Sequence, residues 1–305
     1  MDVKVTFLAA QLPEQGLLSC TGDDARNFLH AQLTSDIAGL DATHARRAGW
    51  CSAKGRLLAT LLVVPQSDGF LLQLARDLSP AVAKRLSMFI LRAKVKLADV
   101  SAAWAQFGVW GAGAAQRLAD AGLAVPQNVL GCADREHGVV VRVARARFLV
   151  LVPAAEGARL AQDLGDAGEA AWALEEIRDG HPQVRLATQD QFVPQMVNLE
   201  RLGAVDFKKG CYPGQEIVAR TQYRGMLKRR MVRARAPVPA SPGDDVFADS
   251  IVGQAAGTVV NAVPRPEGGH ELLAVVQISA TDSAGPIRLR DASGPALELL
   301  ALPGA

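Results

Sequence analysis

The sequence predicts an α+β protein with more than one domain, and three observations support this class. The chain has 305 residues, which exceeds the usual size of a single domain. Predicted strands and helices alternate, but several strands form adjacent hairpins with short connections, which favours mixed or antiparallel sheets over a doubly wound parallel sheet. After about residue 226, short strands are separated by Gly, Pro and Asp, which predicts a small all-β domain.

Hydrophobic periodicity places the elements of the first 180 residues. Apolar residues at helical spacing predict a helix over 24–33, and a turn signal between two apolar runs predicts a hairpin over 57–74. Ser79-Pro80 is expected to start another helix. The expected core face of that helix is Val82, Leu86, Phe89 and Ile90. Further strands are expected at 16–20, 46–51, 94–99, 104–110, 138–144 and 147–152, and further helices at 112–121, 154–164 and 168–179.

Composition excludes several classes of protein. No apolar run approaches the ~20 residues of a membrane span, and the start of the chain lacks the pattern of a signal peptide. The four cysteines are widely spaced without a Cys-x-x-Cys pair, and the five histidines have no ligand spacing. We therefore expect no membrane association, no disulfide framework and no metal site, and a location in the reducing cytoplasm.

One cysteine stands apart from the other three. Cys211 lies between Gly210 and Gly214, directly after Lys208 and Lys209. Neighbouring cations and the start of a helix after Gly214 favour the thiolate form of such a cysteine, and the glycines with the following amides resemble an anion-binding nest. A small packed cysteine in a glycine-rich loop remains the alternative. The other cysteines, Cys20, Cys51 and Cys132, lie in or near apolar segments and are expected in the core.

Positive charge is concentrated around this cysteine. Residues 208–235 hold nine Lys or Arg residues against one acid, Glu216, whereas the whole chain is only +2. Phosphate contacts from 220–235 could bind nucleic acid, but solvated faces of a helix and a strand explain the same charges. Tyr223, also expected as an apolar position of the helix after Gly214, is almost the only aromatic available for stacking, which argues against direct nucleic-acid binding.

Residues 209–216 read Lys-Gly-Cys-Tyr-Pro-Gly-Gln-Glu and resemble the signature of the YgfZ family, folate-binding relatives of the glycine-cleavage T-protein. The resemblance extends over most of 16–231, while the part after it is similar only in character. The other segments that carry it are 21–23, 32–34, 54–56, 191–199, 207–208, 218–220 and 228–229.

This resemblance implies a T-protein-like fold, with α+β domains around a central channel and a C-terminal β-barrel. The implied domains are a folate-binding region of two interleaved subdomains over 1–225 and the barrel over 226–305. In this family the channel holds tetrahydrofolate or a reduced one-carbon folate. The protein supports iron–sulfur cluster assembly or repair, with iron–sulfur proteins or assembly factors as clients, and indirectly tRNA modification.

The resemblance also implies site residues. The functional cysteine and lysine of the signature fall on Cys211 and Lys209, and a tryptophan of the folate pocket falls on Trp172. Before the resemblance is considered, Trp172 on the face of its helix is expected more in a core than in a ligand site. The other implied folate-binding residues are Lys208, Gly210, Tyr212, Gly214, Gln215, Glu216 and Arg220.

The alternative is a true aminomethyltransferase. T-proteins carry a Gly-Gly-x-x-Asp-Asp motif whose carboxylate acts on the folate nitrogen, but here Ala59 and Thr60 occupy both acid positions. No neighbouring side chain in the sequence replaces that proton handling. The departure argues against glycine cleavage and leaves folate binding open, so enzymatic activity of any other kind stays undecided.

Overall fold

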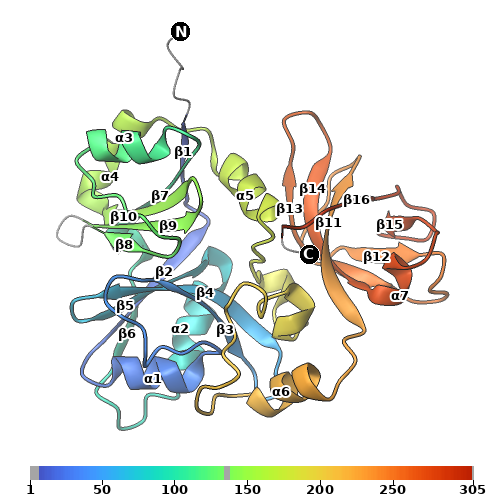
Figure 1. The fold of residues 1–305 in the computed structure, drawn as a ribbon, viewed down its shortest axis with the longest axis horizontal. Helices are drawn as coiled ribbons and strands as arrows, with labels where there is room; N and C mark the ends of the chain where they lie inside the picture. Colours follow the sequence, from blue (N-terminus) through green and yellow to red (C-terminus); the bar gives the residue numbers. More distant parts are fainter. Residues whose placement is uncertain (1–6, 134–137, 304–305) are drawn as a thin grey trace. The chain divides into compact units, whose positions relative to one another are not determined.

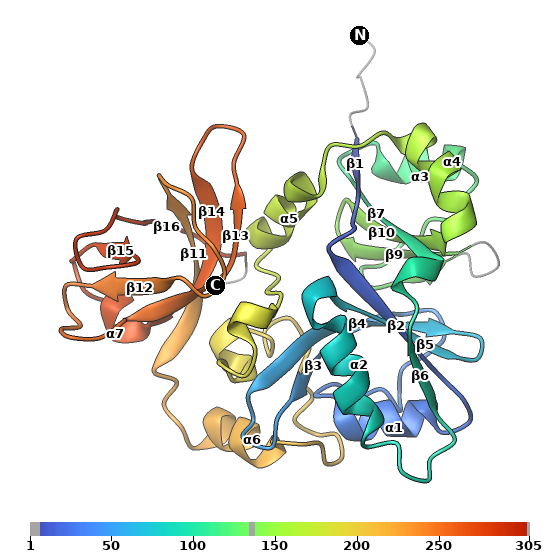
Figure 2. The same cartoon turned by 180° about the vertical axis from the view of Figure 1, so that it is seen from behind.

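A computed structural model describes residues 7–133 and 138–303, and the chain divides into two compact units. Unit 1 is built from 1–31, 36–47 and 61–172, and unit 2 from 32–35, 48–60 and 173–305. The described residues form two five-stranded sheets and one six-stranded sheet (Figures 1 and 2). The boundary expected at 225 remains a prediction.

The first sheet of unit 1 is antiparallel and buried on both faces. Its order is β1 (Leu8–Gln11), β7 (Trp104–Trp110), β10 (Arg147–Pro153), β9 (Val139–Ala144), β8 (Cys132–Ala133). Alternate side chains of a strand point to opposite faces, so Val150 packs with α3 (Ala114–Asp120) and α4 (Ala154–Leu164). Its neighbour Leu151 points into a second core. This two-sided burial explains the nearly continuous apolar sequence of β10.

The second sheet has the order β3 (Arg46–Cys51), β4 (Leu57–Gln66), β5 (Gly69–Ala75), β2 (Gln15–Thr21), β6 (Lys96–Asp99). Within unit 1, Leu17, Val64 and Leu71 of this sheet share the second core with Leu151. Helix α1 (Ala25–Gln32) buries Phe28 and Leu29. Helix α2 (Ser79–Ser87), preceded by the 3-10 turn η1 (Arg76–Leu78), packs on β2 and β6 (Figure 2).

The 3-10 turn η2 (Ser101–Ala103) precedes β7, and α5 (Glu169–Arg178) leads from unit 1 into unit 2. In unit 2 the chain first makes two 3-10 turns, η3 (Leu186–Thr188) and η4 (Pro194–Val197), and then α6 (Gln215–Tyr223).

The C-terminal sheet is a curled half-barrel. Its order is β15 (Ile287–Leu289), β12 (Asp245–Ala248), β13 (Gly257–Pro264), β14 (His270–Gln277), β11 (Arg229–Ala236), β16 (Glu298–Leu300), with α7 (Ile278–Thr281) after β14. Leu272, Val276 and Leu289 belong to its apolar core.

The expected elements are found with small shifts at their ends, but two details of the prediction are wrong. Helix α2 ends at Ser87, so Phe89 lies beyond it and is 44% exposed instead of facing the core, while Ile90 is only half-buried. Strand β1 was not expected, because its four residues pair with β7, almost a hundred positions away in the sequence.

Candidate functional site

The loop before α6 is fixed by hydrogen bonds to its own backbone. The Asp206 carboxylate accepts the backbone amides of Lys208 (2.7 Å) and Lys209 (3.2 Å). The Lys209 ammonium donates to the Leu33 carbonyl (2.9 Å) and lies 4.7 Å from the centre of the Tyr212 ring. Lys209 therefore ties the loop to the segment after α1, in addition to any chemistry that it carries out.

Two glycines bring the segments 54–56 and 209–216 together. Gly214 has a φ of +79°, and a Cβ atom on it would lie 2.4 Å from the Ser52 carbonyl oxygen and 2.6 Å from the Gly55 nitrogen. Gly55 has a φ of +70°, and its Cβ would lie 2.8 Å from that of Ile217. Only glycine tolerates both this conformation and this approach. Two segments that carry the family resemblance thus form one packed turn-on-turn contact within unit 2.

The segment 191–199 is joined by hydrogen bonds to α6 and to β11. The buried Gln195 amide donates to the carbonyl of Val218 in α6 (2.8 Å), and the Asn198 amide donates to the Met231 carbonyl in β11 (3.3 Å). Thr34, fully buried, accepts from the Gly49 amide (2.7 Å) and donates to the Ala204 carbonyl (2.6 Å). These polar side chains hold α6 and the signature loop in place.

Cys211 is the exposed cysteine of the four, while Cys20 and Cys51 are buried and Cys132 is half-buried. Burial raises the pKa of the Cys51 thiol to about 12, with a smaller contribution from the Asp190 charge. Burial likewise raises the pKa of the Tyr212 hydroxyl, helped by Cys51 and Asp206. The loop thus buries its tyrosine and presents its cysteine to solvent.

The remaining sequence-predicted residues of this loop and helix are mostly accessible. Tyr223, expected as an apolar position of the helix, is 70% exposed and contacts only the edge of the Phe207 ring among aromatic side chains described, so that expectation is wrong. The exposed members of the predicted set are Lys208, Gly210, Cys211, Glu216 and Arg220. The partly covered or buried members are Lys209, Tyr212, Gly214 and Gln215.

Trp172 lies in unit 1, whereas the other predicted residues lie in unit 2. It is 5% exposed and meets Trp110 edge-on at 5.8 Å between ring centres. The Arg147 guanidinium lies 4.6 Å from its ring centre, and a Cβ on Gly108 would come within 2.2 Å of the indole. Trp172 is therefore a packed core residue in this structure, as expected from its helix face alone.

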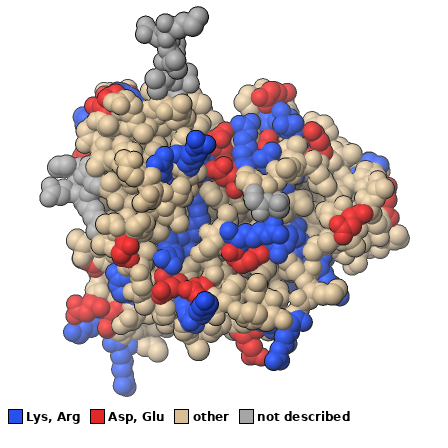
Figure 3. Space-filling model, viewed as in Figure 1, with Lys and Arg blue, Asp and Glu red and all other residues tan. Residues whose placement is uncertain are grey.

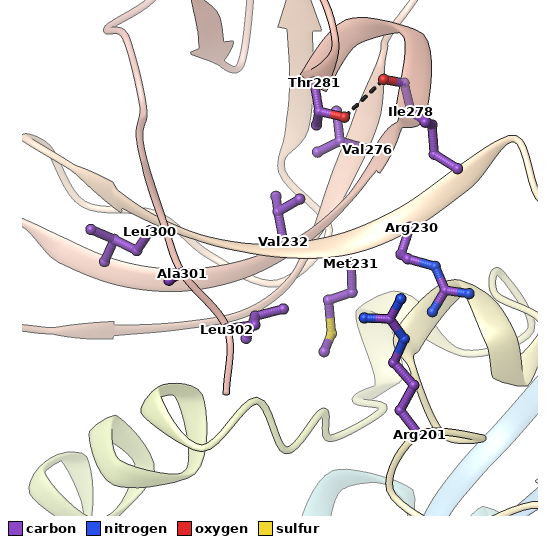
Figure 4. A pocket seen from close by; sticks show the side chains of 10 residues that line it. All are labelled: Arg201, Arg230, Met231, Val232, Val276, Ile278, Thr281, Leu300, Ala301 and Leu302. Atoms are coloured by element: carbon purple, nitrogen blue, oxygen red, sulfur yellow. Dashed lines mark hydrogen bonds between the residues drawn. The ribbon is translucent and has the colours of Figure 1, made fainter. Parts of the chain in front are cut away.

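A cavity of about 320 Å³ opens beside the start of β11 (Figure 4). Its walls are mostly apolar: Met231, Val232, Val276, Ile278, Leu300, Ala301 and Leu302. Figure 4 shows the guanidinium groups of Arg201 and Arg230 turned toward the same end of the cavity. No sequence motif predicts this site, because its lining comes from four separate segments of the chain.

Only one of the two arginines is neutralised. Arg230 donates to the Glu200 carboxylate (2.9 Å) and to the Asn198 side-chain oxygen (2.6 Å). Arg201 is exposed, and no acidic side chain of the described residues lies within ion-pair distance of it. The cavity therefore combines apolar walls with one net positive charge, which suits an anion that carries an apolar body.

The chain is similar to curated proteins over nearly its whole length. No family model matches the chain. The chain is 31% identical over 301 residues to the tRNA-modifying protein YgfZ of Edwardsiella ictaluri, covering 94% of this chain and 89% of that protein. It is also 31% identical over 307 residues to the protein of the same name from Sodalis glossinidius, covering 96% and 92%. The chain belongs to the YgfZ family.

A structural relative confirms the predicted fold. The crystal structure of glycine cleavage system aminomethyltransferase T from Bartonella henselae superposes with a TM-score of 0.80 at 17% identity, covering 97% of this chain and 86% of that one. The α+β, T-protein-like fold with a curled C-terminal sheet is therefore shared. At this level of identity the likeness concerns the fold and not the reaction.

In this YgfZ protein the two positions of the T-protein acids are already used for packing. Ala59 is fully buried, and the Thr60 hydroxyl accepts the Val184 backbone amide at 3.0 Å. Among the described residues, no group of His, Cys, Asp or Glu side chains could hold a metal ion. Nor does any described helix have the length and apolar character needed to cross a membrane.

Two arginines of the basic run, Arg233 and Arg235, form ion pairs within the C-terminal sheet. Glu271 on β14 is 1% exposed, and arginines surround its carboxylate: Arg233 at 3.4 Å, Arg235 at 3.8 Å and Arg265 at 3.8 Å. On the surface, blue and red atoms also lie next to each other over the end of the β13–β14 hairpin (Figure 3). Arg233 and Arg235 thus hold the sheet together, and the cations of the run that are open to solvent are Lys208 and those of 220–228.

Proposed function

We propose that this YgfZ protein binds tetrahydrofolate, or a reduced one-carbon folate, and supports iron–sulfur cluster assembly or repair, and through it tRNA modification. Its clients would be iron–sulfur proteins or their assembly factors. The cavity beside β11 is the observation that carries the folate part. Four free thiols suit a reducing compartment, so we place this work in the cytoplasm.

The cavity matches one end of a folate. A reduced folate joins an apolar p-aminobenzoyl ring to a glutamate with two carboxylates. Apolar residues such as Val232 and Leu302 would pack on the ring, and Arg201 would bind a carboxylate through charged hydrogen bonds. The cavity of about 320 Å³ holds roughly ten water volumes, so it takes this end only, and the pteridine would lie in the channel that the resemblance implies.

The accessory role is supported by the two residues, Ala59 and Thr60, that stand at the positions of the T-protein acids. With Ala59 buried and the Thr60 hydroxyl occupied, no acid is available at these positions for aminomethyl transfer. Cys211 and Lys209 then remain as the functional pair that we propose. Lys209 would hold the loop, and the exposed Cys211 thiol would meet the cofactor or the client.

Calorimetric titration with tetrahydrofolate under anaerobic conditions tests the folate part. We expect binding to the wild-type protein and affinity at least about tenfold weaker for Arg201→Gln, because a hydrogen bond to a charged group contributes roughly 1.5–3 kcal/mol. Arg224→Gln, at an exposed arginine that does not line the cavity, is the matched control. No heat of binding to folded wild-type protein, or equal weakening by both variants, would refute the assignment.

The accessory role has its own test, independent of the cavity. In a bacterial strain that lacks its YgfZ, the wild-type chain should restore the activities of iron–sulfur enzymes, and Cys211→Ala should not. Turnover of aminomethylated or methylated donors with tetrahydrofolate would instead support a transferase. Full restoration by Cys211→Ala would remove the cysteine from the proposal.

A second candidate function is direct contact with RNA through 220–228. The exposure of Tyr223 favours it, because an aromatic ring beside the exposed Arg220 and Arg224 offers both stacking and phosphate contacts. Filter binding of tRNA over a range of salt concentrations tests whether 220–228 binds RNA. A steep loss of affinity with salt that Tyr223→Ala and Arg220→Gln both weaken would support it, and no binding at low salt would end it.

A further inference from the structure

The turn that follows α2 presents three apolar side chains to solvent. Met88 is 64% exposed, Phe89 44% and Leu91 90%. They follow directly on the end of the helix at Ser87, whose own apolar residues Val82 and Leu86 are buried. We call Met88, Phe89 and Leu91 the α2 tip. Apolar side chains gathered in this way on a surface mark an interaction site more often than scattered single ones.

The α2 tip is held in a defined conformation. Backbone hydrogen bonds join Phe89 to Leu86 (3.1 Å) and Ala93 to Ile90 (2.8 Å). The Lys94 amide then donates to the Asp24 carboxylate at 2.7 Å, which fixes the end of the turn. The exposed side chains therefore stand on an ordered backbone, and a partner would meet them without a large cost of ordering.

Leu91 combines two unfavourable properties. Its φ is +42°, in the left-handed region that leucine rarely adopts, and its side chain is almost entirely in water. Glycine or asparagine would fit this backbone with less strain and less exposed apolar surface. A strained residue with no packing role in the chain points to a role toward a ligand.

The surroundings of the α2 tip are strongly basic. Residues 78–98 contain no Asp or Glu. The cations of this segment are Lys84, Arg85, Arg92, Lys94 and Lys96, and all five are exposed. Asp23, 3.2 Å from the Lys94 ammonium, and Asp24, which accepts the Lys94 amide, offset part of this charge, so the five cations exceed these two carboxylates. The α2 tip is thus an apolar centre inside a positively charged rim, the arrangement of a protein interface with its polar border.

We propose that the α2 tip and its basic rim are a docking surface for a protein partner that offers an acidic segment with apolar side chains. Phe89 and Leu91 would be the anchors, and the rim would set the orientation and the rate of association. A membrane partner fits less well, because the apolar face of α2 is buried and leaves only one turn to insert. RNA fits less well, because Phe89 is the one aromatic residue of the segment 78–98. The surface lies in unit 1 and does not depend on the folate assignment.

Site-directed photo-crosslinking in cells that express the full chain tests this proposal. p-Benzoylphenylalanine replaces Phe89 in one strain and Val252, an equally apolar and 90% exposed residue of unit 2, in the control strain. We expect a discrete protein product from position 89 that the control lacks. Mass spectrometry should place the cross-link next to an acidic segment of the partner.

Two further variants separate binding from folding. Leu91→Gly removes the exposed side chain at a backbone position that glycine adopts freely, so the unfolding midpoint should stay equal or rise. The double variant Arg92→Glu and Lys96→Glu reverses part of the rim. Each should lower the yield of the cross-link at least tenfold, and higher salt should lower it as well.

Several results would overturn the proposal. One is the absence of any cross-linked product from position 89 beyond those of the control. Another is a cross-link to lipid, to RNA, to another copy of this chain or to a protein segment without acidic residues. A third is an undiminished yield of the cross-link in Leu91→Gly. Co-sedimentation with vesicles of phosphatidylglycerol and phosphatidylcholine, dependent on Leu91, would likewise replace the protein partner with a membrane surface.

Discussion

The signature loop of unit 2 and the Trp172 cluster of unit 1 differ in what they offer to a ligand. In the loop, Lys209 and Gly214 are fixed by contacts, and Cys211 is left exposed. In the cluster, Trp172 itself is enclosed by Trp110, Arg147 and Gly108. The sequence resemblance to the YgfZ family implies functional residues in both regions. The packing of the two regions differs: the first leaves a thiol exposed to solvent, and the second encloses its indole.

Trp172→Ala is the change with the largest expected effect. Removing a buried indole costs about 3–5 kcal/mol of unfolding free energy, because the packed surroundings cannot fill the cavity. Urea denaturation measures it, and Phe89→Ala, at an exposed aromatic, should stay within about 0.5 kcal/mol. If Trp172→Ala leaves stability unchanged and abolishes folate binding, the indole is a ligand surface and the contrast between the two regions is lost.

Gly214→Ala tests the rigid support of the signature loop. We expect a loss of about 2–3 kcal/mol, since the new Cβ meets the Ser52 carbonyl and the left-handed backbone is strained for alanine. Gly203→Ala is the matched control: its φ of +67° is similar, but nothing lies within 4 Å of the added Cβ. Equal losses in the two variants would show that close contact with residues 52–55 contributes nothing.

Alkaline pH should distinguish the buried thiols from the exposed one. Because the folded-state pKa of Cys51 is raised to about 12 from 9.0, the contribution of this thiol to stability is fully present below pH 9. Above it, the unfolded chain loses the proton that folded Cys51 retains, so the unfolding free energy falls by up to about 1.4 kcal/mol per pH unit. Cys51→Ala should make this fall shallower in urea titrations between pH 8 and 11, and Cys211→Ser should not.

Cys211→Ser should have the smallest effect on stability and the clearest effect on reactivity. An exposed side chain outside the core changes the unfolding free energy by no more than about 0.5 kcal/mol. In the native protein a thiol reagent such as Ellman's reagent should modify Cys211 first, and this fast phase should vanish in the variant. Fast modification of Cys20 or Cys51 before unfolding would contradict the burial on which the comparison depends.

Sequence patterns predict those parts of this molecule that depend on neighbours along the chain. Alternation and helical spacing place β3, β7 and α4, and a motif of eight residues identifies the loop around Cys211. The exposure of Phe89 could not be predicted, because the apolar spacing continues beyond the point where α2 ends. Arg201 and Arg230 could not be predicted as one site for a different reason: only the folded chain brings Arg201, β11, the segment 276–281 and the residues 300–302 to one cavity.

The discontinuous course of the chain sets an order for its synthesis. Unit 1 has all its segments once residue 172 has left the ribosome, because its last segment ends there. Unit 2 needs 32–35 and 48–60 from the beginning of the chain, and these must wait for 173–305. Since domains fold from the N-terminus during translation, residues 48–60 leave the ribosome long before the rest of unit 2, while β3 and β4 already have the other strands of their own sheet. The partners that hold the Cys211 loop, Leu33, Ser52 and Gly55, are all made before the loop itself, so each of these contacts can form as soon as residues 206–217 have left the ribosome.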